Sequence, residues 1–143
     1  MTAHRIPFMD LRPGDDAGRV AAAIRCVIER GWFVLGPEVE AFEHEFAQAC
    51  GTAHAVGVGT GTDAIALTLK ALGIGPGDEV ITTPLSAAFT ALAVMMVGAR
   101  PVFADIDDSR LTLDPEAAAA KINTHTAALL PVHLYGQPAD LKP

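Results

Sequence analysis

The fold is decided by one short stretch of the sequence, Gly57-Val58-Gly59-Thr60-Gly61-Thr62-Asp63-Ala64-Ile65. The apolar residues 53–58 that lead into it predict a buried strand. After it, Ile65, Leu69 and Leu72 recur at helical spacing and predict a helix. We therefore interpret the stretch as a strand, a tight glycine-rich turn and the start of a helix.

Such a turn is a candidate anion site, because the first N–H groups of a helix lack intrahelical partners and lie at its positive end. This arrangement favours phosphate. Gly59 and Gly61 allow the backbone to approach a ligand closely. Thr60 and Thr62 add hydroxyl groups that either cap the helix or donate to phosphate oxygens. The alternative is that Thr60 or Thr62 is an ordinary N-cap and nothing binds.

Composition limits the class of protein. A chain of 143 residues, with 50% hydrophobic and 19% charged residues, predicts one globular domain with a real core. Its net charge of -7 disfavours nucleic acid and anionic membrane surfaces as partners. The longest apolar run, residues 87–97, is too short to span a bilayer, and the first residues carry no apolar core of a secretory signal. We expect a cytoplasmic protein.

The two cysteines show no metal-ligand spacing, so the sequence predicts no metal site. Cys26 and Cys50 lie on helical patterns, and we expect them to be small core or half-buried residues.

The first third of the chain predicts an extended arm over residues 6–11 and an amphipathic helix over 15–30, stopped by Gly31. The apolar segment 32–35 follows as a loop or short strand. It is either packed in the core or buried against a second subunit. A further helix begins with Pro37 at its first position and ends at Gly51.

The rest of the chain alternates strands with helices. We predict strands over 79–83, 100–104 and 127–132, a fully buried helix over 87–97 and another helix over 115–122. This alternation predicts an α/β fold with a mostly parallel sheet covered by helices on both faces. Ligands bind beyond the carboxyl ends of such strands. Those ends are residues 59–62, residues 84–86, Asp105, which we expect to cap a turn, and residues 133–135.

A dinucleotide site is one alternative reading of the glycine-rich turn. The glycines give G-x-G-x-G in place of the dinucleotide fingerprint G-x-G-x-x-G. Glu79 lies at about the right distance to bind a ribose, but it opens a strand instead of closing one. The sequence therefore gives this reading little support.

Six blocks of sequence, in this order, carry a resemblance to a known family: residues 6–11, 36–43, 59–64, 73–80, 98–103 and 131–136. Together they resemble the N-terminal part of the DegT/DnrJ/EryC1/StrS family of sugar aminotransferases, which depend on pyridoxal 5′-phosphate. The resemblance implies a partial large domain of the fold type I, or aspartate aminotransferase-like, transferases. It divides the chain into an N-terminal arm and helix, residues 1–36, and an incomplete cofactor-binding domain, residues 37–143.

The resemblance also implies site residues. Gly61 and Thr62, helped by Thr60, would hold the cofactor phosphate, while Asp63 complements the helix dipole. The family places an aromatic ring over the cofactor at the position of Ala87. Either Phe89 replaces that ring after a local shift, or aliphatic atoms cover the cofactor.

His133 and Tyr135 are candidates for contacting substrate or for supporting groups that do, although a lone histidine at a strand end is more often structural.

The implied reaction moves an amino group from an amino acid, usually glutamate, to a keto group of a nucleotide-linked sugar, within a homodimer. The family's Schiff-base lysine and the carboxylate that binds the pyridine nitrogen lie beyond the blocks matched here. None of Lys70, Lys121 and Lys142 matches the catalytic position, so we expect no catalytic residue and no transamination from these 143 residues alone.

We expect an incomplete domain, either a fragment of a longer enzyme or a truncated product, that is aggregation-prone or oligomeric because a sheet edge is exposed. The alternative is a non-catalytic homologue that binds phosphate or a sugar nucleotide, or that pairs with a full-length subunit.

Overall fold

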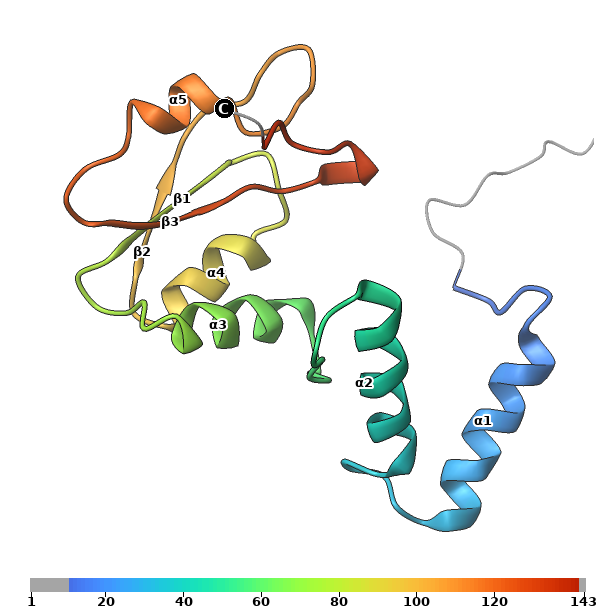
Figure 1. The fold of residues 1–143 in the computed structure, drawn as a ribbon. Helices are drawn as coiled ribbons and strands as arrows, with labels where there is room; N and C mark the ends of the chain where they lie inside the picture. The colour runs from blue at the N-terminus through green and yellow to red at the C-terminus, as the bar shows by residue number, and fades with distance from the viewer. Residues whose placement is uncertain (1–10, 142–143) are drawn as a thin grey trace, which may run out of the picture. The chain divides into compact units, whose positions relative to one another are not determined.

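The structure is a computed structural model that describes residues 11–141 (Figure 1). The chain divides into two compact units, one ending at Gly57 and the other beginning at Val58. The division predicted from the sequence, into an N-terminal arm and helix (residues 1–36) and a cofactor-binding domain (residues 37–143), stays a prediction.

The described part of the first unit, residues 11–57, contains two helices whose ends match the sequence signals. Helix α1 spans Ala17–Arg30 and stops at Gly31, which takes the left-handed conformation at φ 70°. Helix α2 spans Pro37–Cys50, with Pro37 at its start and Gly51 at φ 66° after its end. Glycine is favoured at both stops because it has no Cβ to clash in this conformation. Of the predicted arm, residues 6–10 lie outside the described residues.

The strand predicted over residues 53–58 is absent, so that prediction was wrong. A strand forms only when its backbone groups bond a neighbouring strand. The three strands of the described chain pair with one another and not with this segment. Instead, the Gly57 N–H donates to Glu43 Oε1 on α2, at 2.6 Å.

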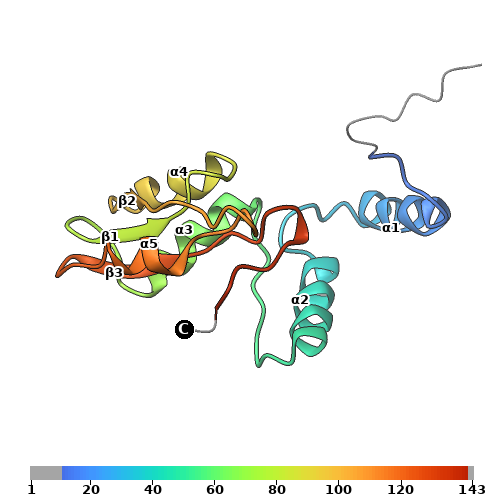
Figure 2. The ribbon, with the colours of Figure 1, turned by 90° about the horizontal axis from the view of Figure 1, so that it is seen from above.

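The second unit is built on a three-stranded parallel sheet with the order β2-β1-β3 (Figures 1 and 2). The strands are β1 (Glu79–Thr82), β2 (Arg100–Phe103) and β3 (Thr126–Leu130). The central strand is fully buried over three residues, since Val80, Ile81 and Thr82 are 0% exposed. The Thr82 hydroxyl also donates to the Leu130 carbonyl across to β3, at 2.8 Å.

Helices cover both faces of this sheet, as the sequence predicts. On the Val80 face, Leu69 of α3 (Gly61–Ala71) and Val94 of α4 (Phe89–Met96) complete one apolar cluster. On the Ile81 face, α5 (Pro115–Ala119) contributes to a second cluster. The short 3₁₀ helix η1 (Leu134–Gly136) follows β3. The alternation of Val80 and Ile81 therefore sets the two layers.

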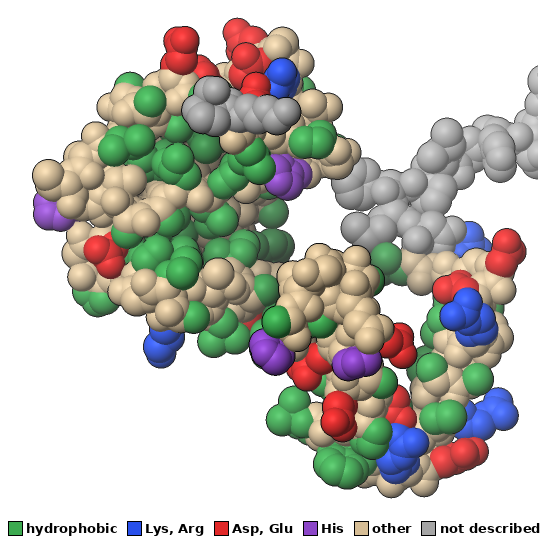
Figure 3. Space-filling model, in the orientation of Figure 1, with side chains coloured by type: hydrophobic (Ala, Val, Ile, Leu, Met, Phe, Trp, Pro, Cys, Tyr) green, Lys and Arg blue, Asp and Glu red, His purple; other side chains and the backbone are tan. Residues whose placement is uncertain are grey.

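Two burial predictions were wrong. Helix α4 is buried only on one side, through Thr90, Ala93 and Val94, whereas Leu92 and Met96 are exposed because no described element of the unit covers that side. The two cysteines are both exposed, since α1 buries none of its residues and α2 buries only Ala47. Figure 3 shows hydrophobic side chains gathered over much of one face of the second unit.

The apolar segment 32–35 is also exposed, with 55% to 74% of each side chain accessible. It is held in shape locally, because the Trp32 indole N–H donates to the Val34 carbonyl at 2.7 Å. Within the described residues, the segment 32–35 therefore does not pack in the core. Burial against a second subunit stays a prediction.

A buried carboxylate joins the starts of the three strands. Glu79 pairs with the Arg100 guanidinium at the start of β2 and accepts from the Asn123 amide, at 2.9 Å, before β3. Its own N–H donates to the His125 carbonyl at 2.8 Å. The Asn123 hydrogen bond, and then Arg100, hold the pKa of Glu79 below its ordinary value of 4.5. Glu79 is thus a structural brace at the amino ends of the strands, which removes it as a ribose ligand.

We predict that this brace makes stability depend on pH. Because the folded pKa lies below 4.5, the stabilisation is fully present above pH 4.5 and is lost as the pH falls through the folded pKa. Glu79→Gln should lower the midpoint of thermal unfolding at pH 7 and flatten its decline between pH 5 and 3. Glu45→Gln on exposed α2 serves as the control. Equal pH profiles for wild type and Glu79→Gln would contradict the brace.

Candidate functional site

The predicted site segments gather at one end of the second unit. The first turn of α3, the start of α4 and η1 all lie toward the end at which the three strands finish (Figure 1). This is the edge at which open parallel sheets bind ligands.

Thr60 is the N-cap of α3. Its extended backbone carries the hydroxyl to Asp63, where Thr60 Oγ1 accepts from the Asp63 N–H at 3.1 Å and donates to Asp63 Oδ2 at 2.8 Å. The Thr60 carbonyl accepts from the Ala64 N–H at 3.0 Å. The capping alternative is therefore realised for Thr60, and its hydroxyl is engaged within the turn.

The next two N–H groups remain available. Within the described residues, the N–H groups of Gly61 and Thr62 have no acceptor. A Cβ built on Gly61 would meet nothing within 4 Å, so no neighbour in the described chain requires glycine there. Asp63 Oδ2 lies 3.6 Å from the corresponding position on Gly59, which places the carboxylate on the Gly59 side. Two N–H groups without acceptors at the start of a helix fit a phosphate group.

A hollow of about 370 Å³ lies beside this turn without containing its free N–H groups. It is lined by Gly59 and Asp63 and follows the flank of α3 to Lys70 and to Met96 of α4. Its lining carries one carboxylate, that of Asp63, and one ammonium, that of Lys70, and it includes neither Gly61 nor Thr62. We therefore place the candidate phosphate site at the end of α3 and not along its flank.

The turn between β1 and α4 is fixed by its own hydroxyl groups. Thr83 Oγ1 accepts from the Leu85 N–H at 3.2 Å, and the hydroxyls of Ser86 and Thr90 lie 3.1 Å apart. Ala87 is exposed just before the helix. Phe89, the first residue of α4, shares its exposed side with Leu92 and Met96 at helical spacing. The structure therefore shows no local shift that turns Phe89 toward Ala87.

His133 and Tyr135 lie beyond the end of β3. His133 Nδ1 accepts from the Ala139 N–H at 3.0 Å, which anchors the segment that follows. Tyr135 takes the left-handed conformation, at φ 54° and ψ 25°, and its side chain is 97% exposed. The turn cap expected at Asp105 is not formed, because its Oδ1 accepts from the adjacent Ile106 N–H at 2.8 Å and Ile106 bridges to Leu113 instead of entering a turn.

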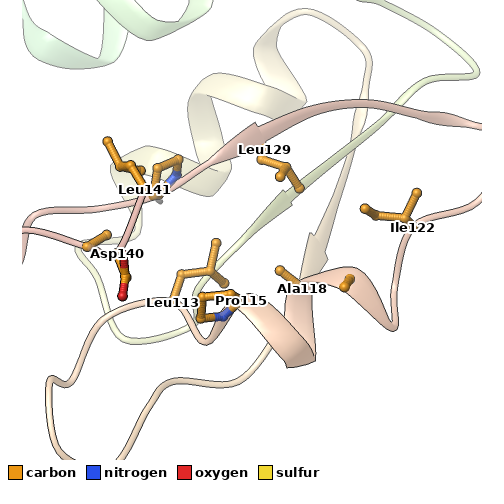
Figure 4. Close-up of a pocket in the computed structure, with 10 residues that line it drawn as sticks. Leu113, Pro115, Ala118, Ile122, Leu129, Asp140 and Leu141 are labelled. Carbon is orange, nitrogen blue, oxygen red and sulfur yellow. The ribbon is translucent and has the colours of Figure 1, made fainter. Parts of the chain in front are cut away.

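Two features escaped the sequence analysis. Asp107 Oδ1 accepts from the hydroxyl and N–H of Ser109 and from the Arg110 N–H, and these bonds hold the pKa of Asp107 below its ordinary value of 3.8. An apolar hollow of about 490 Å³ lies between α5, β3 and residues 139–141 (Figure 4). No local pattern could predict it, because the side chains that point into it come from separate segments: Leu113, Pro115, Ala118, Ile122, Leu129 and Leu141.

The lysines do not meet at the α3 turn. Lys70 lies in the last turn of α3, and Lys121 lines a hollow of about 390 Å³ with Phe103 and Asp105 near the end of β2. Lys142 lies outside the described residues. Over residues 11–141, no group of three metal-ligating side chains converges, and no helix is long and apolar enough to cross a membrane.

The sequence profile of the DegT/DnrJ/EryC1/StrS aminotransferase family matches residues 15–143. The chain belongs to this family. It is 49% identical over 139 residues to the dTDP-3-amino-3,4,6-trideoxy-alpha-D-glucose transaminase of Streptomyces venezuelae, covering 96% of this chain and 37% of that relative. The family is one of aminotransferases, and its cofactor is pyridoxal 5′-phosphate.

Solved structures agree with the fold. The crystal structure of S. venezuelae DesV in complex with a ketimine intermediate matches with a TM-score of 0.90 and 48% identity, over 95% of this chain and 37% of that one. NtdA from Bacillus subtilis, with bound cofactor PMP, matches with a TM-score of 0.89 and 34% identity, over 95% and 32%. The chain thus spans about a third of the length of these relatives, and its α/β fold is that of the fold type I large domain.

The cap on α3 generates a prediction about stability. Thr60→Ala removes the acceptor for the Asp63 N–H and should lower the free energy of unfolding by about 0.5–2 kcal/mol, measured by urea denaturation. Thr60→Ser keeps the hydroxyl and should retain most of the stability. If Thr60→Ala proves as stable as wild type, the cap does not hold the turn.

Proposed function

We propose that this chain is the N-terminal, cofactor-binding portion of a pyridoxal-phosphate-dependent aminotransferase. It would act with an amino acid, glutamate by the family resemblance, and with a keto group of a nucleotide-linked sugar. The observation that carries the proposal is the α3 turn, where the Gly61 and Thr62 N–H groups lack acceptors within the described chain. Family membership supports the same reading.

In this proposal, each residue at the strand ends has a separate task. Gly61 and Thr62 bind the phosphate with backbone N–H groups and, at Thr62, a hydroxyl. Thr60 holds that turn in shape through its bonds to Asp63. Ala87 covers one face of the cofactor ring with a methyl group, since Phe89 lies on the outer side of α4. When bound, the cofactor supplies the electron sink that transamination requires.

The exposed apolar surfaces fit a longer assembly. The outer side of α4, the 32–35 segment and the α1 stripe of Val20, Ile24 and Ile28 are uncovered in the described chain. We propose that they pack against the remainder of a longer enzyme and against a second subunit, because the relatives are nearly three times as long. The homodimer and the cytoplasmic location stay predictions.

The phosphate site is tested by adding one methyl group. Gly61→Ala should raise the free energy of unfolding by about 0.4–1 kcal/mol, because its Cβ meets no neighbour. In the proposed site, the added methyl group would crowd the phosphate and cost the N–H groups a charge-assisted hydrogen bond. Gly61→Ala should therefore lower the affinity for pyridoxal 5′-phosphate on the order of tenfold or more.

Gly18→Ala is the matched control, because Gly18 also lies in the first turn of a helix and its Cβ also meets nothing within 4 Å. It should gain similar stability and leave cofactor affinity unchanged. Affinity is measured by absorbance titration, with pyridoxal as the ligand that lacks phosphate. Equal affinities for pyridoxal and its phosphate would contradict the site.

A second prediction concerns the lysines. Borohydride treatment of these 143 residues with cofactor, followed by peptide mass spectrometry, should leave Lys70, Lys121 and Lys142 unmodified at stoichiometric cofactor. None lies at the α3 turn among the described residues, and Lys142 lies outside them. Stoichiometric reduction onto Lys121 would contradict this and would make the hollow near Asp105 the reaction centre.

A further inference from the structure

The segment from His133 to Ala139 is anchored at both ends and bonded within itself. It follows β3 after Pro131 and Val132, and Ala139 is buried, with its N–H bonded to His133 Nδ1. Between these anchors, the Gly136 N–H donates to the His133 carbonyl at 3.3 Å, and the Gln137 N–H to the Leu134 carbonyl at 3.0 Å. The backbone around Tyr135 therefore has a defined shape before any ligand arrives.

Tyr135 is held there at a cost. Its φ of 54° lies in the left-handed region, which glycine and asparagine occupy readily and a bulky aromatic residue occupies rarely. Its ring is 97% exposed, and in the described part of the chain its hydroxyl has no hydrogen-bond partner. Contacts of the ring within the described chain therefore do not offset the cost of the left-handed conformation. A strained backbone conformation persists only where other interactions stabilise it.

The position and chemistry of the ring indicate what it meets. It stands at the carboxyl end of β3, the edge at which the sheet binds ligands. A flat aromatic face with a polar tip suits a planar, partly polar ring. In a nucleotide-linked sugar, the planar ring is the base. The base is also the part of the substrate farthest from the keto group that receives the amino group, so it suits a side chain as exposed as Tyr135.

We propose that Tyr135 binds the pyrimidine base of the nucleotide-linked substrate by ring stacking, an inference that rests on the proposed function. His133 is a positioning residue. With Nδ1 accepting from Ala139, the neutral ring carries its proton on Nε2, and the ring holds the segment that presents Tyr135. The sugar nucleotide would then run from the base at Tyr135 toward the turn at Ala87.

Substitutions at Tyr135 separate the effect of its ring on binding from the effect of its backbone strain on stability. Tyr135→Gly removes the ring and relieves the left-handed strain, so its unfolding midpoint should rise while its affinity for dTDP falls on the order of tenfold or more. Tyr135→Phe keeps the aromatic face and should bind dTDP within about threefold of wild type. Leu111→Gly is the matched control, because Leu111 also has a positive φ, at 57°, and an exposed side chain. It should gain stability without losing dTDP affinity.

Titration calorimetry on the protein without cofactor gives the readout, with dTDP as the ligand and pyrophosphate as the probe that lacks a base. Unchanged dTDP affinity in Tyr135→Gly would overturn the inference, as would an equal loss for dTDP and pyrophosphate. Because dTDP binding is measured without cofactor, these results are distinct from a failure to bind pyridoxal 5′-phosphate. Absence of that cofactor from wild type would count against the proposed function alone.

Discussion

The rest of the second unit depends on the complete burial of one four-residue strand. Val80, Ile81 and Thr82 of β1 are 0% exposed, and both edges of β1 are hydrogen-bonded, to β2 and to β3. Val80 meets α3 and α4 on one face, and Ile81 meets the layer of α5 on the other. Glu79 ties the amino ends of the strands together. Removing β1 would leave each layer without the surface on which it packs.

This burial also determines where chemistry is possible. At the amino ends of the strands the Glu79 carboxylate is engaged by Arg100 and Asn123, so we place the candidate site at the opposite edge. There the Thr60 side chain caps α3 by accepting from the Asp63 N–H. The N–H groups of Gly61 and Thr62 have no acceptor within the described chain. Capping and anion binding, which the sequence presents as alternatives, are therefore compatible at neighbouring positions of one turn.

Sequence reasoning succeeded where a local signal decides the outcome. Proline at the start of α2 and glycine after α1 and α2 marked helix ends correctly. It failed where the outcome depends on a partner. Residues 53–58 have the composition of a strand but no neighbouring strand in the described chain, and α4 is apolar on a side that nothing described covers. The strain at Tyr135 was equally invisible, since no pattern predicts a left-handed tyrosine.

The central claim is that the end of α3 binds the cofactor phosphate, and amide NMR tests it most directly. In ¹⁵N-labelled protein, pyridoxal 5′-phosphate should shift the Gly61 and Thr62 N–H resonances downfield, since both N–H groups gain a charged acceptor. Pyridoxal, which has no phosphate, should leave them in place. If the phosphorylated cofactor binds and shifts other resonances while those of Gly61 and Thr62 stay unmoved, the account of this site is wrong.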